Sequence, residues 1–182
     1  QLGYKLSGME FTISSEIPPG IGMGSSAALG VATAFAVSKL LSAELSDFQI
    51  IQSAAMAESA FMGIEQPLTD QFVSTVAQQD RIVLLDLHTL DYEYIDYDFS
   101  DVELVLTASN VPVVSPHDEL RERRMKCGEC VTLLKNRKLG SRLSEFTSFD
   151  LHNSMGMVPE ELRRICIHVI EENERVKEAA AY

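Results

Sequence analysis

Glycine and serine recur in a short stretch near the start of the chain, in a pattern that could bind an anion. The stretch PPGIGMGSSA, residues 18–27, places Gly20, Gly22 and Gly24 at alternate positions. Glycine lets backbone N–H groups approach a ligand closely, and a helix start adds unpaired donors and a partial positive charge. The stretch therefore predicts a loop that holds phosphate. A glycine-rich turn with a serine N-cap is the alternative.

Two familiar phosphate-binding loops do not fit this stretch. The G-x-x-x-x-G-K-[ST] loop needs a lysine, and none lies between Glu16 and Ser38. The dinucleotide fingerprint G-x-G-x-x-G needs a third glycine where Ser25 stands. Ser25 and Ser26 instead supply hydroxyls that can cap a helix, contact phosphate oxygen or ligate magnesium.

A carboxylate interrupts the apolar face of the helix expected at residues 46–62. That face comprises Ile51, Ala54, Ala55, Ala57, Phe61 and Met62. At about 100° per residue, Glu58 falls near the middle of it. Because a buried carboxylate needs a cation or hydrogen-bond donors, Glu58 is a candidate magnesium ligand. The alternative is a partly exposed Glu58 paired with a basic side chain.

A second acidic residue, Asp70, stands in the stretch EQPLTDQFVS at residues 65–74. Thr69 or Asp70 would serve as an ordinary N-cap for a helix that begins there. The local sequence by itself favours this structural role for Asp70.

Composition and charge exclude several classes of partner. The 182 residues carry a formal net charge of −12 at pH 7, and the pI is about 4.7. Such a chain has no long-range attraction for nucleic acid or for an anionic membrane. The longest apolar run, around residues 27–37, is too short and broken to cross a bilayer. We therefore expect small-molecule partners, with no nucleic acid and no membrane; the oligomeric state is not indicated.

The cysteines are Cys127, Cys130 and Cys166, a set too sparse and odd in number for a disulfide framework. The C-x-x-C pair cannot complete a four-cysteine zinc site. It falls on an apolar helical stripe made of Leu120, Cys127, Val131 and Leu134. We therefore expect ordinary core cysteines and a reducing compartment, the cytoplasm.

Hydrophobic periodicity predicts a mixed succession of elements. Strands are expected at residues 11–17, in a hairpin at 81–99 with its turn near 88–91, and at 102–108. Helices are expected at 27–41, 46–62, 70–78, 117–135, 142–153 and 159–180. The stretch SNVPVVSP, residues 109–116, is the best candidate for a domain junction.

Several segments form a wider pattern along the chain. They are PPGIGMGSSAALG, AESAFMGIEQPLTDQFVS, IVLLDLHTLDYEYI, ELRERRMKCGECVTLL and HVIEENERVKEAA. In order and spacing they resemble motifs of the galactokinase family, within the GHMP superfamily of small-molecule kinases. The second segment aligns without a gap with the family's Ala-Glu-Asn-x-Phe-x-Gly and Cys-Gly-Ile-Met-Asp-Gln-Phe motifs.

The resemblance implies an α+β, GHMP-kinase-like fold with two lobes. Residues 1–110 would form part of an N-terminal, ATP-binding lobe similar to domain 2 of ribosomal protein S5. Residues 111–182 would form part of a more helical, ferredoxin-like C-terminal lobe. Both lobes are expected to be incomplete, because the family's Arg-x-Asn-Leu-Ile-Gly-Glu-His-x-Asp-Tyr segment and its C-terminal Gly-rich motif are not among these residues. The isolated chain is therefore expected to be inactive.

The resemblance also implies an activity: ATP-dependent phosphorylation of a sugar hydroxyl, at the anomeric position of galactose or a related sugar, with Mg²⁺. Asp70 would be the catalytic base or would orient the sugar hydroxyl, and Ser25, Ser26 and Glu58 would hold the metal. The loop that contacts ATP would comprise Gly20, Ile21, Gly22, Met23, Gly24, Ser25, Ser26 and Ala27.

Two positions that bind the sugar in the family, beside Asp70, depart from its pattern. Pro67 stands where the family has glycine, and proline has no N–H to donate. Leu120 stands where the family has tyrosine, and leucine cannot hydrogen-bond. These changes indicate a different sugar or a lost activity. They leave open a second interpretation, a galactokinase-like sensor or regulator that binds sugar and nucleotide without catalysis.

Overall fold

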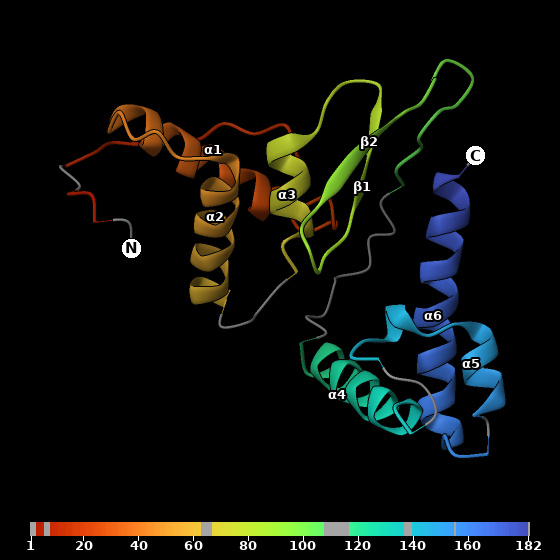
Figure 1. Ribbon diagram of the computed structural model, residues 1–182. Coiled ribbons are helices and arrows are strands. Elements are labelled where there is room, and N and C mark those ends of the chain that lie inside the picture. The colour runs from red at the N-terminus through yellow and green to blue at the C-terminus, as the bar shows by residue number, and fades with distance from the viewer. Residues whose placement is uncertain are drawn as a thin grey trace. The chain divides into compact units, whose positions relative to one another are not determined.

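The computed structural model describes residues 3–5, 8–62, 67–107, 117–136, 140–154 and 156–181. The chain divides into two compact units, Gln1–Val113 and Val114–Tyr182 (Figure 1). The expected junction at residues 109–116 lies outside the described residues. The described residues form helices and one small sheet, which agrees with the expected α+β class.

Three helices form the larger part of the first unit, and all three were expected. They are α1 (Ser25–Leu40), α2 (Asp47–Met62) and α3 (Thr69–Val76), packed against one another (Figure 1). The hydroxyl of Ser46 accepts a hydrogen bond from the N–H of Gln49 at 3.3 Å and so caps α2.

Helix α2 contributes to two small hydrophobic clusters through neighbouring residues. Ile50 packs with Val31 of α1, whereas Ile51 packs with Phe72 of α3. Successive residues of a helix point about 100° apart, so α2 can serve both clusters at once. Glu58 follows Ile51 by two turns and therefore lies on the side of α2 that faces α3. This packing places the carboxylate between helices.

The predicted apolar face of α2 is buried only over its first turns. Ile51, Ala54 and Ala55 are buried, but Ala57 is exposed and Phe61 is 89% exposed. Periodicity identified one face correctly, yet the neighbouring helices cover it incompletely among the described residues.

The expected hairpin is present and lies against α3. Strand β1 (Arg81–Leu85) pairs antiparallel with β2 (Tyr92–Asp96). The carboxylate of Asp86 orders the turn by accepting from the N–H of His88 at 2.7 Å. The Tyr94 hydroxyl donates to the carbonyl of Val76, the last residue of α3, at 2.6 Å. The hairpin therefore braces the end of the helix that carries Asp70.

The strands expected at residues 11–17 and 102–108 are not formed in the described part of the chain, where β1 and β2 make the only sheet. Alternating apolar residues predict a half-buried surface but cannot supply a hydrogen-bonded neighbour. Phe11 and Leu104 are accordingly 51% and 82% exposed.

The second unit is helical. Its elements are α4 (His117–Leu134), the short 3₁₀ helix η1 (Leu143–Glu145), α5 (Ser148–Asn153) and α6 (Glu160–Ala180). The single helix expected at 142–153 is wrong, because Thr147 is extended and caps α5 in a capping box with Asp150. No helix in the described residues has the length and apolar composition to cross a bilayer.

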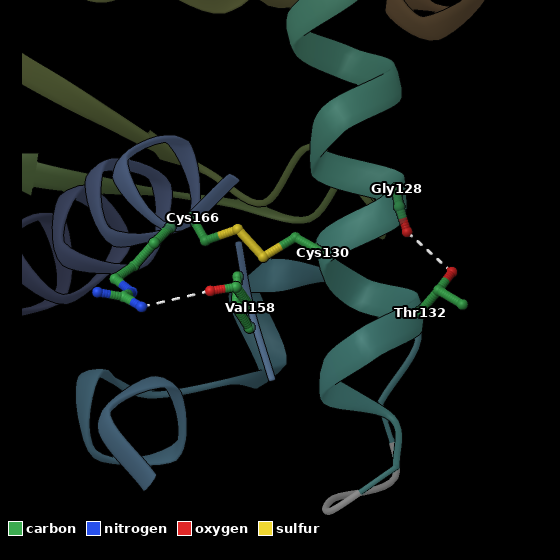
Figure 2. The surroundings of a disulfide bond; sticks show 6 residues. Gly128, Cys130, Thr132, Val158 and Cys166 are labelled. Atoms are coloured by element: carbon green, nitrogen blue, oxygen red, sulfur yellow. Dashed lines mark hydrogen bonds between the residues drawn. A yellow bond between two sulfur atoms is a disulfide. The ribbon is translucent and has the colours of Figure 1, made fainter. Parts of the chain in front are cut away.

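A disulfide lies in the core of the second unit (Figure 2). It joins Cys130 of α4 to Cys166 of α6, and both residues are fully buried. Cys130 is thus a core residue, as expected for the C-x-x-C pair, but it is joined in a disulfide, which the sparse and odd set of cysteines did not indicate. The number and spacing of cysteines do not reveal contacts between helices, and the two bonded cysteines are 36 residues apart in the sequence.

Cys127 is free and half-buried, and burial raises the pKa of its thiol.

Close packing of α1 on α2 depends on Gly30. A Cβ at this position would lie 3.3 Å from the Cβ of Ala54, closer than ordinary van der Waals contact. We expect Gly30→Val to force the helices apart and to lower the free energy of unfolding by about 1–3 kcal/mol. Denaturant unfolding of the intact protein, followed by circular dichroism, measures this loss.

Gly128→Val is the matched control. Gly128 also lies inside a helix, but a Cβ there would meet nothing within 4 Å. It carries the same change in helix propensity without a clash. Equal destabilisation by the two substitutions would contradict the packing argument.

Candidate functional site

The glycine-serine loop has the backbone that only glycine adopts readily. Gly20, Gly22 and Gly24 have φ values of 76°, 79° and 65°, all in the left-handed region. A Cβ added at Gly20 or Gly22 would meet nothing within 4 Å, so both positions border open space. The path of the loop thus explains the alternate glycines, and it leaves their backbone accessible to a ligand.

Helix α1 begins at this loop without a side-chain cap. Its N-cap is Gly24, and the first helical hydrogen bond runs from the N–H of Ala28 to the carbonyl of Gly24 at 2.9 Å. The alternative of a serine N-cap is therefore wrong, because Ser25 is already helical. The N–H groups of residues 25–27 have no acceptor within the helix. Such a helix start can bind an anion.

The carboxylate of Glu58 is bound by two neutral donors. The Ser26 hydroxyl of α1 donates to Oε1 at 2.5 Å. The Gln71 amide of α3 donates to Oε2, also at 2.5 Å. The prediction that Glu58 needs donors is confirmed, and the alternative of a basic partner is wrong for the described residues. Both carboxylate oxygens of Glu58 therefore accept hydrogen bonds, but no basic side chain among the described residues neutralises the charge.

Gln71 is a site residue that sequence reasoning missed. Its side chain is only 2% exposed, and its Oε1 atom is buried without a hydrogen-bond partner in the described part of the chain. Its place between Asp70 and the buried Phe72 was the available signal.

Asp70 lies in the first turn of α3 but does not cap the helix. The N-cap is Leu68, with no side-chain hydrogen bond, so the expected cap by Thr69 or Asp70 is wrong. A Cβ added at Gly24 would lie 3.4 Å from the Oδ2 atom of Asp70. The carboxylate is therefore placed directly beside the loop and has no capping role there.

These groups surround one open hollow of about 470 Å³ in the first unit. It is lined by Gly20, Gly22, Met23, Gly24, Ser25, Ser26, Glu58, Pro67, Thr69, Asp70 and Gln71. Residues from the loop and from three helices thus meet as the sequence predicted.

Two described residues of the predicted set, Ile21 and Ala27, do not line this hollow. The side chain of Ile21 is 47% exposed, and that of Ala27 is buried at 2%. The predicted role of both residues rests on their backbone. Leu120 belongs to α4 in the second unit, and its side chain lies outside the described residues.

The donor set fits a hard divalent cation. Mg²⁺ prefers oxygen ligands, and it commonly takes one or two carboxylates while phosphates and water complete its shell. The hollow offers the Glu58 and Asp70 carboxylates and the hydroxyls of Ser25 and Ser26. No group of three or more His, Cys, Asp or Glu residues that could hold a metal by itself occurs in the described ranges. The site therefore suits a metal that arrives with phosphates.

Comparison with known proteins agrees with this geometry. Residues 1–78 match the family model of the GHMP kinase N-terminal domain. The galactokinase of Thermotoga neapolitana is 36% identical over 174 residues, which is 96% of this chain and 47% of that protein. The galactokinase of Clostridium perfringens is 29% identical over 180 residues, covering 97% of this chain and 46% of its own.

A solved structure shares the fold. The crystal structure of Lactococcus lactis galactokinase complexed with galactose superimposes with a TM-score of 0.81 at 24% identity. The match covers 90% of this chain and 42% of that one. The chain spans about half the length of the curated relatives it matches. The chain is thus similar to galactokinases over part of their length, and its residues 1–78 match the N-terminal domain of the GHMP kinases.

Proposed function

We propose that the protein carrying this chain is a galactokinase-like sugar kinase that transfers the γ-phosphoryl group of ATP to a sugar hydroxyl. The observation that carries the proposal is the position of Glu58. Its carboxylate is hydrogen-bonded to Ser26 in the first turn of α1, so a negative charge already lies beside the helix start. The same helix start would attract the phosphates of ATP, and the two negative groups would repel each other. A divalent cation between the two resolves that conflict.

The loop would bind the phosphates of ATP through its backbone. The N–H groups of residues 25–27 and the exposed backbone at Gly20 and Gly22 supply donors that need no positive side chain. This suits a chain whose net charge is −12. Ile21 and Met23 would contribute main-chain contacts between the glycines.

Ser25, Ser26 and Glu58 would hold Mg²⁺. When bound, the ion neutralises charge on the phosphates. The chain's contribution is to present hydroxyl and carboxylate oxygens at the start of α1, on elements fixed by the packing of α1, α2 and α3. Precise positioning of this kind is the main source of catalysis in phosphoryl transfer.

Asp70 would act on the sugar. Its carboxylate is exposed, lies beside Gly24 and makes no capping hydrogen bond. It can accept the proton of the attacking hydroxyl as the oxygen bonds to phosphorus and ADP leaves, or it can orient that hydroxyl. Both roles need the carboxylate next to the phosphate loop, where the structure has it.

The substrate we propose is galactose or a related sugar, phosphorylated at the anomeric hydroxyl. The relatives are galactokinases, and one of them was crystallised with galactose. Pro67 lines the hollow near Asp70 and cannot donate a backbone hydrogen bond to the sugar. Residues 1–110 would belong to an N-terminal lobe and residues 111–182 to a C-terminal lobe. A cytoplasmic location remains our prediction.

Asp70→Asn tests the catalytic assignment. We expect kcat for sugar phosphorylation by the intact protein to fall about 10²–10⁴-fold while ATP binding is retained, because the amide cannot accept the proton. ADP release over a panel of sugars and calorimetric ATP binding give the two readouts. Asp47→Asn, at the exposed first turn of α2, is the control. A wild-type protein that binds sugar and ATP without forming ADP would instead be a sensor.

Ser26→Ala and Glu58→Gln test the metal assignment. Both should raise the Mg²⁺ concentration needed for half-maximal activity, about 10-fold or more, because each removes a ligand or its orienting partner. Activity measured against Mg²⁺ at fixed ATP shows the shift. Glu44→Gln, an exposed acidic residue between α1 and α2, controls for loss of charge. An unchanged Mg²⁺ requirement in both test variants would refute the assignment.

Gly22→Val tests the loop. A side chain there would enter the hollow and strain the left-handed backbone, so we expect ATP binding to be lost. Gly3→Val is a close control, because Gly3 has φ 77° and equally open surroundings but does not line the hollow. Calorimetric titration with ATP compares the two. Similar losses in both variants would point to general misfolding.

A further inference from the structure

We infer that Gln71 is a positioning residue: it fixes the orientation in which Glu58 receives the divalent cation. The inference rests on the metal role proposed for Glu58.

The first support is the way Gln71 is held. It is 2% exposed, and the hydroxyl of Thr75 donates to its backbone carbonyl at 2.8 Å one turn along α3. The next residue, Phe72, is buried in the cluster with Ile51 of α2. The amide therefore projects from a packed helix rather than from a loop, as a positioning group requires.

The second support is the chemistry of the contact. The Gln71 amide donates to Oε2 of Glu58 while Ser26 donates to Oε1. With both oxygens held, the carboxylate cannot rotate freely, and Oε1 stays beside the first turn of α1. A lysine or arginine could orient Glu58 equally well but would cancel its charge. A neutral amide orients the carboxylate and preserves its attraction for a cation.

The third support is the oxygen of the same amide. Buried side-chain polar atoms almost always have a partner, yet Oε1 of Gln71 has none in the described residues. A glutamine kept for stability alone would be satisfied at both ends. This one is satisfied only at the end that faces Glu58, and it lines the same hollow.

The test measures metal binding without turnover. Mn²⁺ is titrated into the intact protein in the presence of saturating ADP, and free Mn²⁺ is followed by electron paramagnetic resonance. Gln71→Met keeps the size of the side chain and removes the donor. We expect the apparent dissociation constant for Mn²⁺ to rise about 10-fold, with ADP affinity in the absence of metal unchanged. Gln71→Asn, whose amide is too short to reach Glu58, should behave alike.

A double-substitution cycle shows whether Gln71 acts through Glu58. Glu58→Gln should weaken Mn²⁺ binding more than Gln71→Met, and adding Gln71→Met to Glu58→Gln should cause no further loss. Ser74→Ala, at an exposed position of the same helix, is the control and should bind Mn²⁺ like the wild type. Thermal melting checks that every variant folds.

The outcomes separate this inference from the proposed function. If Glu58→Gln weakens Mn²⁺ binding but neither Gln71 variant does, Gln71 is not a positioning residue and the metal role of Glu58 stands. Independent, additive losses also overturn the inference. If Glu58→Gln leaves Mn²⁺ binding unchanged, the metal assignment itself fails.

Discussion

The half-buried carboxylate of Glu58 is the constraint on which the site depends. A charge in that position needs donors, and α1 and α3 provide one each through Ser26 and Gln71. Supplying them requires α1 and α3 to lie within hydrogen-bonding distance of α2, and the small residues Gly30 and Ala54 allow the close approach of α1 to α2. The same convergence brings the phosphate loop and Asp70 to one hollow. The same arrangement of α1, α2 and α3 therefore packs the three helices together and assembles the site.

Within this site, the backbone supplies positive potential and the side chains supply negative charge. Left-handed glycines and an uncapped helix start supply positive potential without a basic side chain. The carboxylates of Glu58 and Asp70 line the same hollow, and the two donors that bind Glu58 are neutral. The metal-phosphate complex that we propose as the ligand would match both kinds of group, the backbone donors and the carboxylates.

The sequence was informative where one residue type answers a local requirement. Alternate glycines predicted a loop, which is present and has left-handed backbone at all three glycines, and Glu58 on an apolar face predicted a need for donors, which is confirmed. It failed where a partner comes from elsewhere in the chain. The strand at 11–17 lacks a paired neighbour in the described residues, and the donor from Gln71 and the link between Cys130 and Cys166 depend on contacts between elements. Hydrophobic periodicity identifies which face of a helix or strand is apolar, but it does not identify the element that packs against that face.

The disulfide of the second unit gives that part of the chain a different covalent topology. Because Cys130 and Cys166 are joined, the segment between them, with η1 and α5, is a closed ring. In the chain-entropy view, such a ring stabilises the fold mainly by restricting the unfolded chain. A single peptide-bond cleavage inside the ring would leave one covalently connected molecule, which would separate into two fragments only after reduction.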